Sequence, residues 1–181
     1  MQTERLLIRL IKKEDLNYYC DLLCSKKIQE DLTPLKSIEE VENFVDSALL
    51  DADSKKRYVF SLFYKEDKKF VGFVELKVDD NDIGELKCVV CPSFWNKGLG
   101  SEAMAKLDQF AVEKLELSKM KGTCSLFNSA CTNLFKNVLK YDYIKTDLVD
   151  GKDYLFFEKQ GHLKNIDYRG KLKTDLGDVK K

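Results

Sequence analysis

Glycines, a lysine and a tryptophan gather in one turn near the middle of the chain. The run WNKGLGS (residues 95–101) lies between a predicted strand and a predicted helix. Glycines let the backbone turn so that successive N–H groups point into one concavity. The helix that follows adds unpaired N–H donors and the positive end of its dipole. These residue types in this order indicate an anion site suited to phosphate, and Lys97 adds a mobile positive charge.

Three phosphate-containing ligands could use such a turn, and an ordinary turn before a helix is a fourth interpretation. A P-loop requires a Lys directly after its last glycine, and no Lys follows Gly100. A dinucleotide fingerprint matches the letters of residues 98–103, but it should open the fold and precede an acidic residue by about 20 positions. Here the motif lies in mid-chain, and residues 123–125 (TCS) stand where the acid should be. The third ligand is coenzyme A. The turn by itself does not distinguish a coenzyme A site from an ordinary turn before a helix.

Six cysteines raise the question of a metal site or disulfides. Cys88 and Cys91 form a C-x-x-C, but a zinc knuckle needs that motif on a tight turn. The two intervening residues are valines in a predicted strand, whose period of two sends the two thiols to opposite faces. Cys20 and Cys24 are four apart on a predicted helix. We therefore expect reduced cysteines that act as small hydrophobic side chains, and no metal site.

The elements that must position the turn follow from hydrophobic periodicity. Apolar runs between charged turns predict strands at residues 6–11, 57–64, 70–76, 83–90, 120–125, 143–148 and 154–159. Helical spacing predicts helices near residues 14–24, 37–52, 101–115 and 131–138. Ser37 and Glu40 form a capping box, and Pro34 separates the first two helices. The short links between residues 57 and 90 predict an antiparallel meander, and Asp150-Gly151 turns a closing hairpin.

Composition places these elements in one soluble globular domain. The chain has 181 residues, of which 44% are hydrophobic and 34% charged. Lys plus Arg and Asp plus Glu both total 31, so no overall charge favours nucleic acid or a membrane surface. No apolar run approaches the ~20 residues of a membrane span, and no signal-peptide layout begins the chain, so we expect a cytoplasmic protein. Residues 1–159 form the predicted domain, and residues 160–181 a basic C-terminal extension.

The sequence resembles the GNAT superfamily of acetyltransferases, in particular the branch that acetylates the N-termini of ribosomal proteins. Five features occur in the order of that branch: TERLLIR (3–9), FVGFV (70–74), GELKCVV (84–90) with Pro92 after it, Phe94-Trp95 with the turn NKGLGSEA (96–103), and Asn128 before the next helix. The likeness covers about residues 3–159. It implies an α/β (α+β) fold with a mixed, mostly antiparallel central sheet flanked by helices.

The resemblance also implies how coenzyme A is held. Pantetheine would pair with the backbone beside Val89 and Val90 like an added strand, and one of these N–H groups would stabilise the oxyanion. The pyrophosphate would lie on the amides of the turn, and Asn128 would reach the pantetheine across a gap in the sheet. The implied cofactor-binding residues are Val89, Val90, Trp95, Asn96, Lys97, Gly98, Leu99, Gly100, Ser101 and Asn128. Packing beneath the turn is the alternative role of Trp95.

The acid is where the match departs from the family. Acetyl transfer needs a neutral amine, a stabilised oxyanion and a proton for the departing thiolate. Many superfamily members have a Tyr seven residues after the Asn, where this chain has Phe135. The N-x-x-S motif of the branch reads NSAC (128–131), which makes Cys131 the candidate acid, with a reference thiol pKa of ~8.5. Packing against Leu134 is its alternative, and Tyr141 is a further candidate.

The candidate bases are Glu85 and Glu75 on the central strands, and either could act through water. The alternative for each is an exposed strand carboxylate without a catalytic role. His162 is the only histidine and lies beyond the matched region, so we do not expect it to be catalytic. The helix after Asn128 lacks the usual Gly-aromatic end, and we expect it to close at Asp142, since Asp tolerates the left-handed conformation.

We therefore expect an N-acetyltransferase that moves acetyl from acetyl-CoA directly to a primary amine, of a protein N-terminus or a small molecule, in a ternary complex. The alternative, motivated by Phe135, is a CoA-binding or sensing module with weak or no catalysis. A dinucleotide enzyme is a third hypothesis. The first two helices and the final hairpin would shape the acceptor pocket, and the protein would be a monomer or a homodimer.

Overall fold

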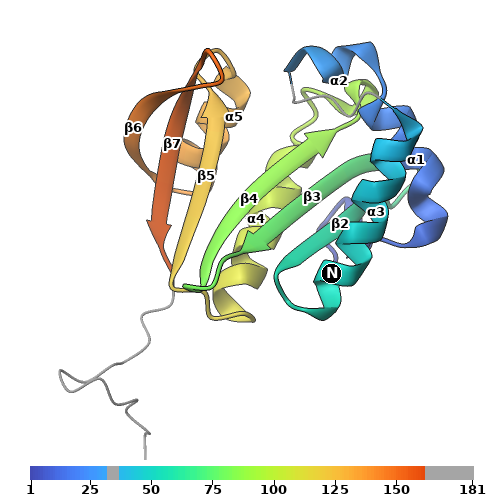
Figure 1. Cartoon of the computed structure of the whole chain (residues 1–181), viewed down its shortest axis with the longest axis horizontal. Coiled ribbons are helices and arrows are strands. Elements are labelled where there is room, and N and C mark those ends of the chain that lie inside the picture. Colours follow the sequence, from blue (N-terminus) through green and yellow to red (C-terminus); the bar gives the residue numbers. More distant parts are fainter. Residues whose placement is uncertain (32–36, 162–181) are drawn as a thin grey trace, which may run out of the picture.

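The computed structural model describes residues 1–31 and 37–161 of the chain. One sheet runs in the order β1-β2-β3-β4-β5-β7-β6 (Figure 1). Its strands are β1 (Leu6–Leu10), β2 (Arg57–Tyr64), β3 (Phe70–Val78), β4 (Ile83–Val90), β5 (Lys119–Ser125), β6 (Asp142–Val149) and β7 (Lys152–Gln160). All neighbours are antiparallel except β4 and β5, which are parallel. The mixed, mostly antiparallel sheet is confirmed, and so is the meander.

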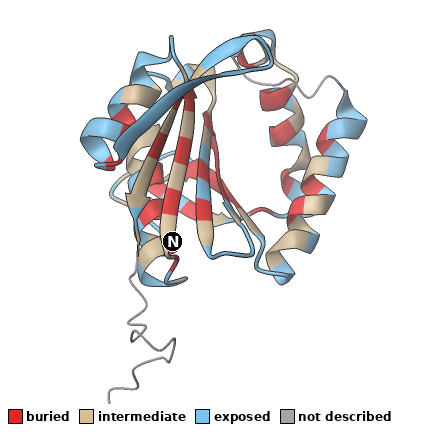
Figure 2. Ribbon diagram, turned by 60° about the vertical axis from the view of Figure 1, so that its left-hand side comes forward, coloured by how far each residue is buried: buried red, intermediate tan, exposed pale blue. Residues whose placement is uncertain are grey.

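Helices cover both faces of the sheet (Figure 2). They are α1 (Leu16–Leu23), α2 (Lys26–Asp31), α3 (Ile38–Asp53), α4 (Leu99–Glu113) and α5 (Ser129–Asn133), and α5 continues into a π-helical turn, Leu134–Val138. The predicted element order holds, with α2 as an additional short helix. The capping box at the start of α3 is present: the Glu40 N–H donates to Ser37 Oγ, and the Ser37 N–H donates to Glu40 Oε2.

Two hydrophobic cores lie on opposite faces of the sheet. One packs α4 against the sheet and includes Leu6, Leu107 and Phe157; the other packs α1 and α3 against it and includes Tyr19, Val45 and Val89. Cys88 packs on the first core and Cys91 on the second, so their predicted placement on opposite faces is confirmed.

The predicted end of the helix after Asn128 is wrong. The π-helical turn stops at Val138, and Lys140 (φ 59°), not Asp142, takes the left-handed conformation. Asp142 is the first residue of β6. The chain can turn at Lys140 because Leu139 and Tyr141 on either side are both buried and anchor it.

The chain ends outside the described part. β7 runs to Gln160, and the Gly161 N–H donates to the Ser118 carbonyl at 3.0 Å, so the sheet extends just past residue 159. Pro34, His162 and nearly all of the predicted C-terminal extension lie outside the described residues.

Candidate active site between two diverging strands

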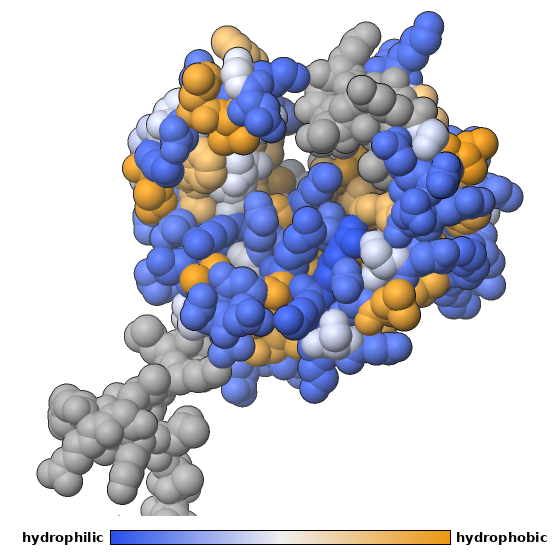
Figure 3. All heavy atoms as spheres, in the orientation of Figure 1, coloured by the Kyte–Doolittle hydropathy of each residue, from blue (hydrophilic) through white to orange (hydrophobic). Residues whose placement is uncertain are grey.

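The two parallel strands at the centre of the sheet separate along their length. The pairing of β4 with β5 begins at Ile83 and Lys119 and ends at Leu86 and Gly122. Beyond that point the strands diverge toward the end of β4 (Figure 1), and the surface is hollowed between the two halves of the molecule (Figure 3). The last residues of β4 therefore pair with β3 on one edge and have no strand partner on the other.

The hydrogen-bond ladder shows which backbone groups face this edge. The Cys91 N–H donates to the Val71 carbonyl of β3 at 2.8 Å, and Val89 stands opposite Phe73 in the same ladder. Since hydrogen-bonded pairs alternate in an antiparallel ladder, the Val89 backbone also points to β3. The N–H groups of Cys88 and Val90 then point toward the gap. Of the two predicted valines, Val90 rather than Val89 has this orientation, and Cys88 joins it.

The period of two could have identified Cys88 from the sequence, once one backbone direction in the strand was known. The Val89 side chain is buried against α1 and α3, which is consistent with its place in the β3 ladder.

Trp95 secures the turn to the end of β4. Its indole Nε1–H donates to the Val90 carbonyl at 2.7 Å, while the residue as a whole remains 40% exposed. The predicted alternative, packing beneath the turn, thus describes only part of its role. The bond occupies the Val90 carbonyl and leaves the Val90 N–H directed into the gap.

The turn itself needs two left-handed residues. Asn96 has φ 59° and Gly98 has φ 73°, and Gly98 is the residue before the first turn of α4. Glycine has no side chain to cap the helix, so the N–H groups of Leu99, Gly100 and Ser101 have no side-chain acceptor from that position. A Cβ on Gly100 would lie 3.3 Å from Val90 Cγ2 and 3.5 Å from Cys88 Sγ. This close approach brings the helix terminus next to the open edge of β4.

An ion-pair network that the sequence did not predict fixes the turn from the other side. Glu102 accepts hydrogen bonds from the Arg5 N–H (2.9 Å), Arg5 Nε (2.7 Å) and the Thr3 hydroxyl. Arg5 Nη1 also donates to the Lys97 carbonyl at 2.8 Å. Burial acts to raise the pKa of Glu102, but these hydrogen bonds outweigh it and lower that pKa. Thr3, Arg5 and Glu102 all lie within the motifs that carry the family resemblance. Their place in those motifs was the only signal in the sequence for this network.

Asn128 opens α5 on the far side of the gap. Its Oδ1 accepts a hydrogen bond from the Cys131 N–H at 3.0 Å, and the side chain is otherwise exposed. Because the oxygen caps the helix, the Nδ2 amide remains as the donating end. The prediction that Asn128 opens this helix is confirmed.

Three cysteines from three elements lie in or against the core on the α4 side of the sheet: Cys88 of β4, Cys124 of β5 and Cys131 of α5. Hydrogen bonding to Cys124 raises the pKa of Cys131, and burial adds to this shift. The pKa of Cys124 is lowered to about 7, because Cys131 and the Thr132 hydroxyl (3.6 Å) hydrogen-bond to it. Burial raises the pKa of Cys88 to about 12. At neutral pH Cys131 therefore keeps its proton.

Phe135 and Tyr141 are core residues. Phe135 is 1% exposed, stacks on Phe157 with 5.4 Å between ring centroids, and lies where a Cβ on Gly122 would meet its ring at 2.0 Å. The buried Tyr141 hydroxyl donates to Asp108 at 2.6 Å. Burial raises the pKa of Tyr141, and the Asp108 charge raises it further. Tyr141 is committed to this bond on the α4 side of the sheet.

The two candidate bases differ in their surroundings. Glu75 is 2% exposed and accepts a bond from Arg57 Nε at 2.6 Å, so its description as an exposed strand carboxylate is wrong. Glu85 is exposed and lines a recess of about 200 Å³ with Glu75, Lys77 and Lys87. This recess lies on β3 and β4, on the face of Glu85 and Val89 rather than that of Cys88.

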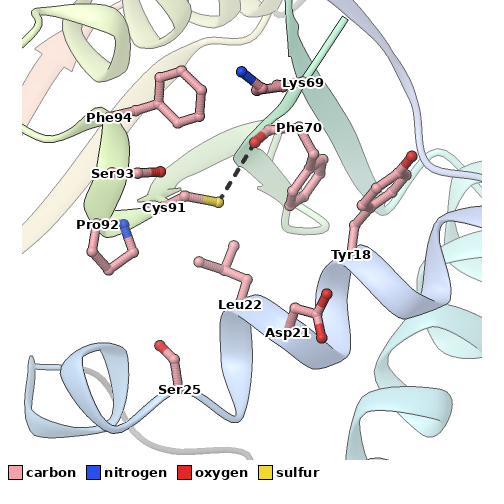
Figure 4. A pocket seen from close by; sticks show the side chains of 10 residues that line it. All are labelled: Tyr18, Asp21, Leu22, Ser25, Lys69, Phe70, Cys91, Pro92, Ser93 and Phe94. Atoms are coloured by element: carbon pink, nitrogen blue, oxygen red, sulfur yellow. Dashed lines mark hydrogen bonds between the residues drawn. The ribbon is translucent and has the colours of Figure 1, made fainter.

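A larger recess of about 340 Å³ lies between α1 and the segment that follows β4 (Figure 4). Tyr18, Asp21 and Leu22 approach it from α1, and Cys91 to Phe94 from the opposite side. The Cys91 thiol donates to the Phe70 carbonyl at 3.8 Å across its floor. Neither recess contains the glycine turn itself.

A seven-stranded mixed sheet whose parallel pair diverges beside a glycine turn and a helix N-terminus defines an acyltransferase fold. The chain belongs to the GNAT acetyltransferase family, whose domain model matches residues 5–138. The resemblance drawn from the sequence is thereby confirmed.

The relatives agree with this assignment. The chain is 22% identical to the N-acetyltransferase p20 of Bacillus licheniformis, over 99% of this chain and 92% of that one. A spermidine N-acetyltransferase from Vibrio cholerae, solved with CoA and spermine, superposes with a TM-score of 0.77 at 17% identity, over 88% of this chain and 97% of that one. RimL, an α-N-acetyltransferase of ribosomal protein L7/L12 solved with CoA, gives 0.77 at 14% identity, over 87% and 95%.

Residues 1–31 and 37–161 contain no group of three or more His, Cys, Asp or Glu side chains that could hold a metal ion. No helix in the same ranges is both long and apolar enough to cross a bilayer.

Proposed function

We propose that this protein is an acetyl-CoA-dependent N-acetyltransferase that acts on a primary amine by direct transfer in a ternary complex. The observation that carries the proposal is the open edge of β4, with the uncapped start of α4 beside it. A strand edge pairs with an extended amide-containing chain, and an uncapped helix start binds phosphate. Pantetheine and pyrophosphate are those two groups, joined in one molecule.

The turn would hold the pyrophosphate and the gap the pantetheine arm. The N–H groups from Asn96 to Ser101 would donate to the phosphates, with Lys97 as a mobile counter-charge. Val90 would donate a backbone bond to pantetheine, and Asn128 Nδ2 would donate from the other side. The arm then extends along the β4 edge toward Cys88, where the strands converge.

The chemistry requires that the amine nitrogen attack the thioester carbonyl and that the C–S bond then break. The Cys88 N–H, deepest on the open edge, would donate to the oxyanion. Cys131 would give its proton to the departing thiolate, since its raised pKa keeps that proton in place at neutral pH. Glu85 would receive the proton of the amine through water, from the recess on the α1 and α3 face.

A panel of amines tests the activity. We expect release of CoA thiol from acetyl-CoA with at least one class among N-terminal peptides, polyamines and other small primary amines. Tight CoA binding with no turnover on any amine would instead support the CoA-binding or sensing module. That alternative is favoured by Phe135, which offers no proton at the position where many relatives carry Tyr.

The role of Cys131 is tested by substitution. Cys131→Ala should lower kcat by roughly 100-fold, the lower end of the contribution of a general acid, with little change in KM for acetyl-CoA. Cys131→Ser should recover part of the rate, because a hydroxyl can also donate. Cys20→Ala, on α1, is the control and should behave as wild type. If Cys131→Ala keeps its kcat, Cys131 only packs against Leu134.

A further inference from the structure

A row of charged residues crosses three strands beside the smaller recess, the one of about 200 Å³ that Glu85 lines. In the strand registers, Lys77 of β3 stands opposite Glu85 of β4, and Glu85 stands opposite Lys121 of β5. Residues directly opposite in neighbouring strands point to the same face of a sheet. Leu76 and Leu86, which alternate with them, belong to the core against α4. The charged row therefore lies on the other face, the one that α1 and α3 partly cover.

Glu75, the second carboxylate of the recess, already has a cationic partner. It is buried and accepts a hydrogen bond from Arg57 Nε at 2.6 Å. Lys77 Nζ lies 3.9 Å from Glu75 Oε1, and the Lys77 side chain is largely exposed, so this contact is weak. Arg57 and Glu75 thus neutralise one another in the wall of the recess, and Glu75 is not available to the ammonium group of a ligand.

The other charges leave an excess of positive charge around one carboxylate. Lys87 stands opposite Glu75 in the register and also lines the recess. Among the residues that the structure describes, the side chains of Glu85, Lys87 and Lys121 form no ion pair or hydrogen bond. Three lysines, Lys77, Lys87 and Lys121, are therefore the neighbours of Glu85 on this face. Figure 3 shows hydrophilic side chains gathered over the middle of the same face, below the hollow between the two halves of the molecule.

We propose that the acceptor is a primary amine that carries an anionic group, such as a carboxylate, a few bonds from its nitrogen. The lysines would bind the anionic group, and Glu85 would face the nitrogen through water. The inference rests on the proposed function, because it names the substrate class of the same site. A polyamine has no anionic group and brings further positive charge to this face, so repulsion between like charges would disfavour it.

The position of Lys87 limits the size of such an acceptor. Lys87 directly precedes Cys88, whose N–H is the proposed oxyanion donor, and Glu85 lies three residues before Cys88. At the ~3.3 Å rise per residue of a strand, both charges are within roughly 10 Å of the point of transfer. The nitrogen and the anionic group therefore fit within one small molecule or within the first two residues of a peptide.

Matched amines test the substrate class. β-Alanine carries a carboxylate where propylamine has a methyl group, and the dipeptide amides Ser-Asp and Ser-Asn differ in one charge at the second residue. We expect kcat/KM to be roughly fivefold higher, the effect of one partly exposed ion pair, for the anionic member of at least one pair. The pair that shows the difference identifies a small molecule or a peptide as the source of the anionic group. Spermidine should react more slowly than the preferred anionic amine.

Variants test whether the lysines cause the preference. Lys87→Glu reverses one charge of the recess and should lower kcat/KM for the anionic amine more than for its neutral counterpart, mainly through KM. Lys77→Glu, one strand away, should act in the same direction. Lys114→Glu is the matched control, because Lys114 is an exposed residue directly after α4, and it should behave as wild type.

Calorimetric titration of the same amines into the protein with CoA present separates this inference from the proposed function. Acetylation of both members of each pair at equal rates, spermidine as the best acceptor, or an unchanged preference in Lys87→Glu would overturn the inference and leave the acetyltransferase in place. If no amine is acetylated but an anionic amine binds, its neutral counterpart does not, and Lys87→Glu abolishes the binding, the recess stands and the proposed function fails. Neither acetylation nor binding would overturn both.

Discussion

At the scale of single residues, the site depends on Gly98, which has no side chain to cap the start of α4. This residue has φ 73°, and its missing side chain leaves the first amides of α4 without a cap. A second glycine with the same conformation, Gly151 (φ 76°), lies in the turn between β6 and β7. A Cβ added at either position would meet no atom within 3.4 Å, so both substitutions would cause strain rather than a clash. Comparing substitutions at Gly98 and Gly151 therefore distinguishes an effect of backbone strain from an effect on ligand binding.

Gly98→Ala and Gly151→Ala should each lower the free energy of unfolding by about 1 kcal/mol, the cost of a left-handed Ala. Only Gly98→Ala should also weaken CoA binding, because it changes the turn that carries the amides. Chemical denaturation measures the first effect and calorimetric titration the second. Equal CoA affinity in both variants would contradict the assignment of the pyrophosphate to this turn.

Tyr141 shows how a chemically plausible residue can be structural. Tyr141→Phe removes the bond to Asp108 and should destabilise the fold by about 1–3 kcal/mol, since a buried carboxylate loses a partner. Lys159 Nζ, 2.7 Å from Asp108 Oδ2, retains part of the pairing. Because the Tyr141 side chain is buried and its hydroxyl donates to Asp108 rather than to the gap, kcat should not change. A large loss of kcat with unchanged stability would make Tyr141 the acid.

At the scale of elements, the N-terminal segment holds the start of α4 in place. Arg5 and Thr3 bind Glu102 in the first turn, and Arg5 also binds the carbonyl of Lys97. Contacts between residues almost 100 positions apart leave no periodic trace in a sequence. The β4 boundaries and the strand at 57–64 were predictable because their apolar runs are local and the turns that flank them are charged. The end of the π-helical turn after α5 was not predictable, because buried neighbours rather than a residue that tolerates the left-handed conformation decide where the chain turns.

Glu102→Gln should weaken CoA binding and lower the free energy of unfolding by about 1 kcal/mol, a modest value because Arg5 is partly exposed and solvent screens the pair. Glu113→Gln, at the exposed end of the same helix, is the matched control and should leave CoA binding unchanged. Titration of CoA into both variants measures the difference. If the two variants bind CoA alike, the network does not shape the turn.

At the scale of the whole molecule, two carboxylates link stability to pH. Burial acts to raise the pKa of Asp15, but hydrogen bonds from Arg9, the Lys12 N–H and Ser61 lower it, and Glu102 is lowered in the same way. A carboxylate with a lowered folded pKa stabilises the fold fully above its ordinary value and loses this contribution as pH falls through the folded pKa. The fold should therefore weaken as pH falls below 4.5 and then 3.8, the ordinary values for the two groups.

Urea denaturation at a series of pH values measures this dependence. Wild type should lose stability on acidification, and Glu102→Gln should show a shallower loss. A wild-type free energy of unfolding that does not change across this range would contradict the role of these carboxylates.

The overall arrangement was predictable to the level of fold, since the motifs in order identify the family and the family fixes the sheet. For the candidate site, the sequence predicted which segment of β4 borders coenzyme A but not which of its backbone N–H groups face the ligand. Which of Cys88, Val89 and Val90 presents its N–H to the gap depends on the ladder with β3, and the contact between Cys124 and Thr132 depends on how α5 folds back onto β5.

The central claim is that coenzyme A lies along the open edge of β4 with its pyrophosphate on the turn. Backbone amide chemical shifts during a titration with CoA test it most directly. We predict large shifts for Cys88, Val90 and residues 96–101, and small ones for Val89 and for β1 and β2. Shifts confined to the recess beside α1, or none at the turn, would contradict the claim.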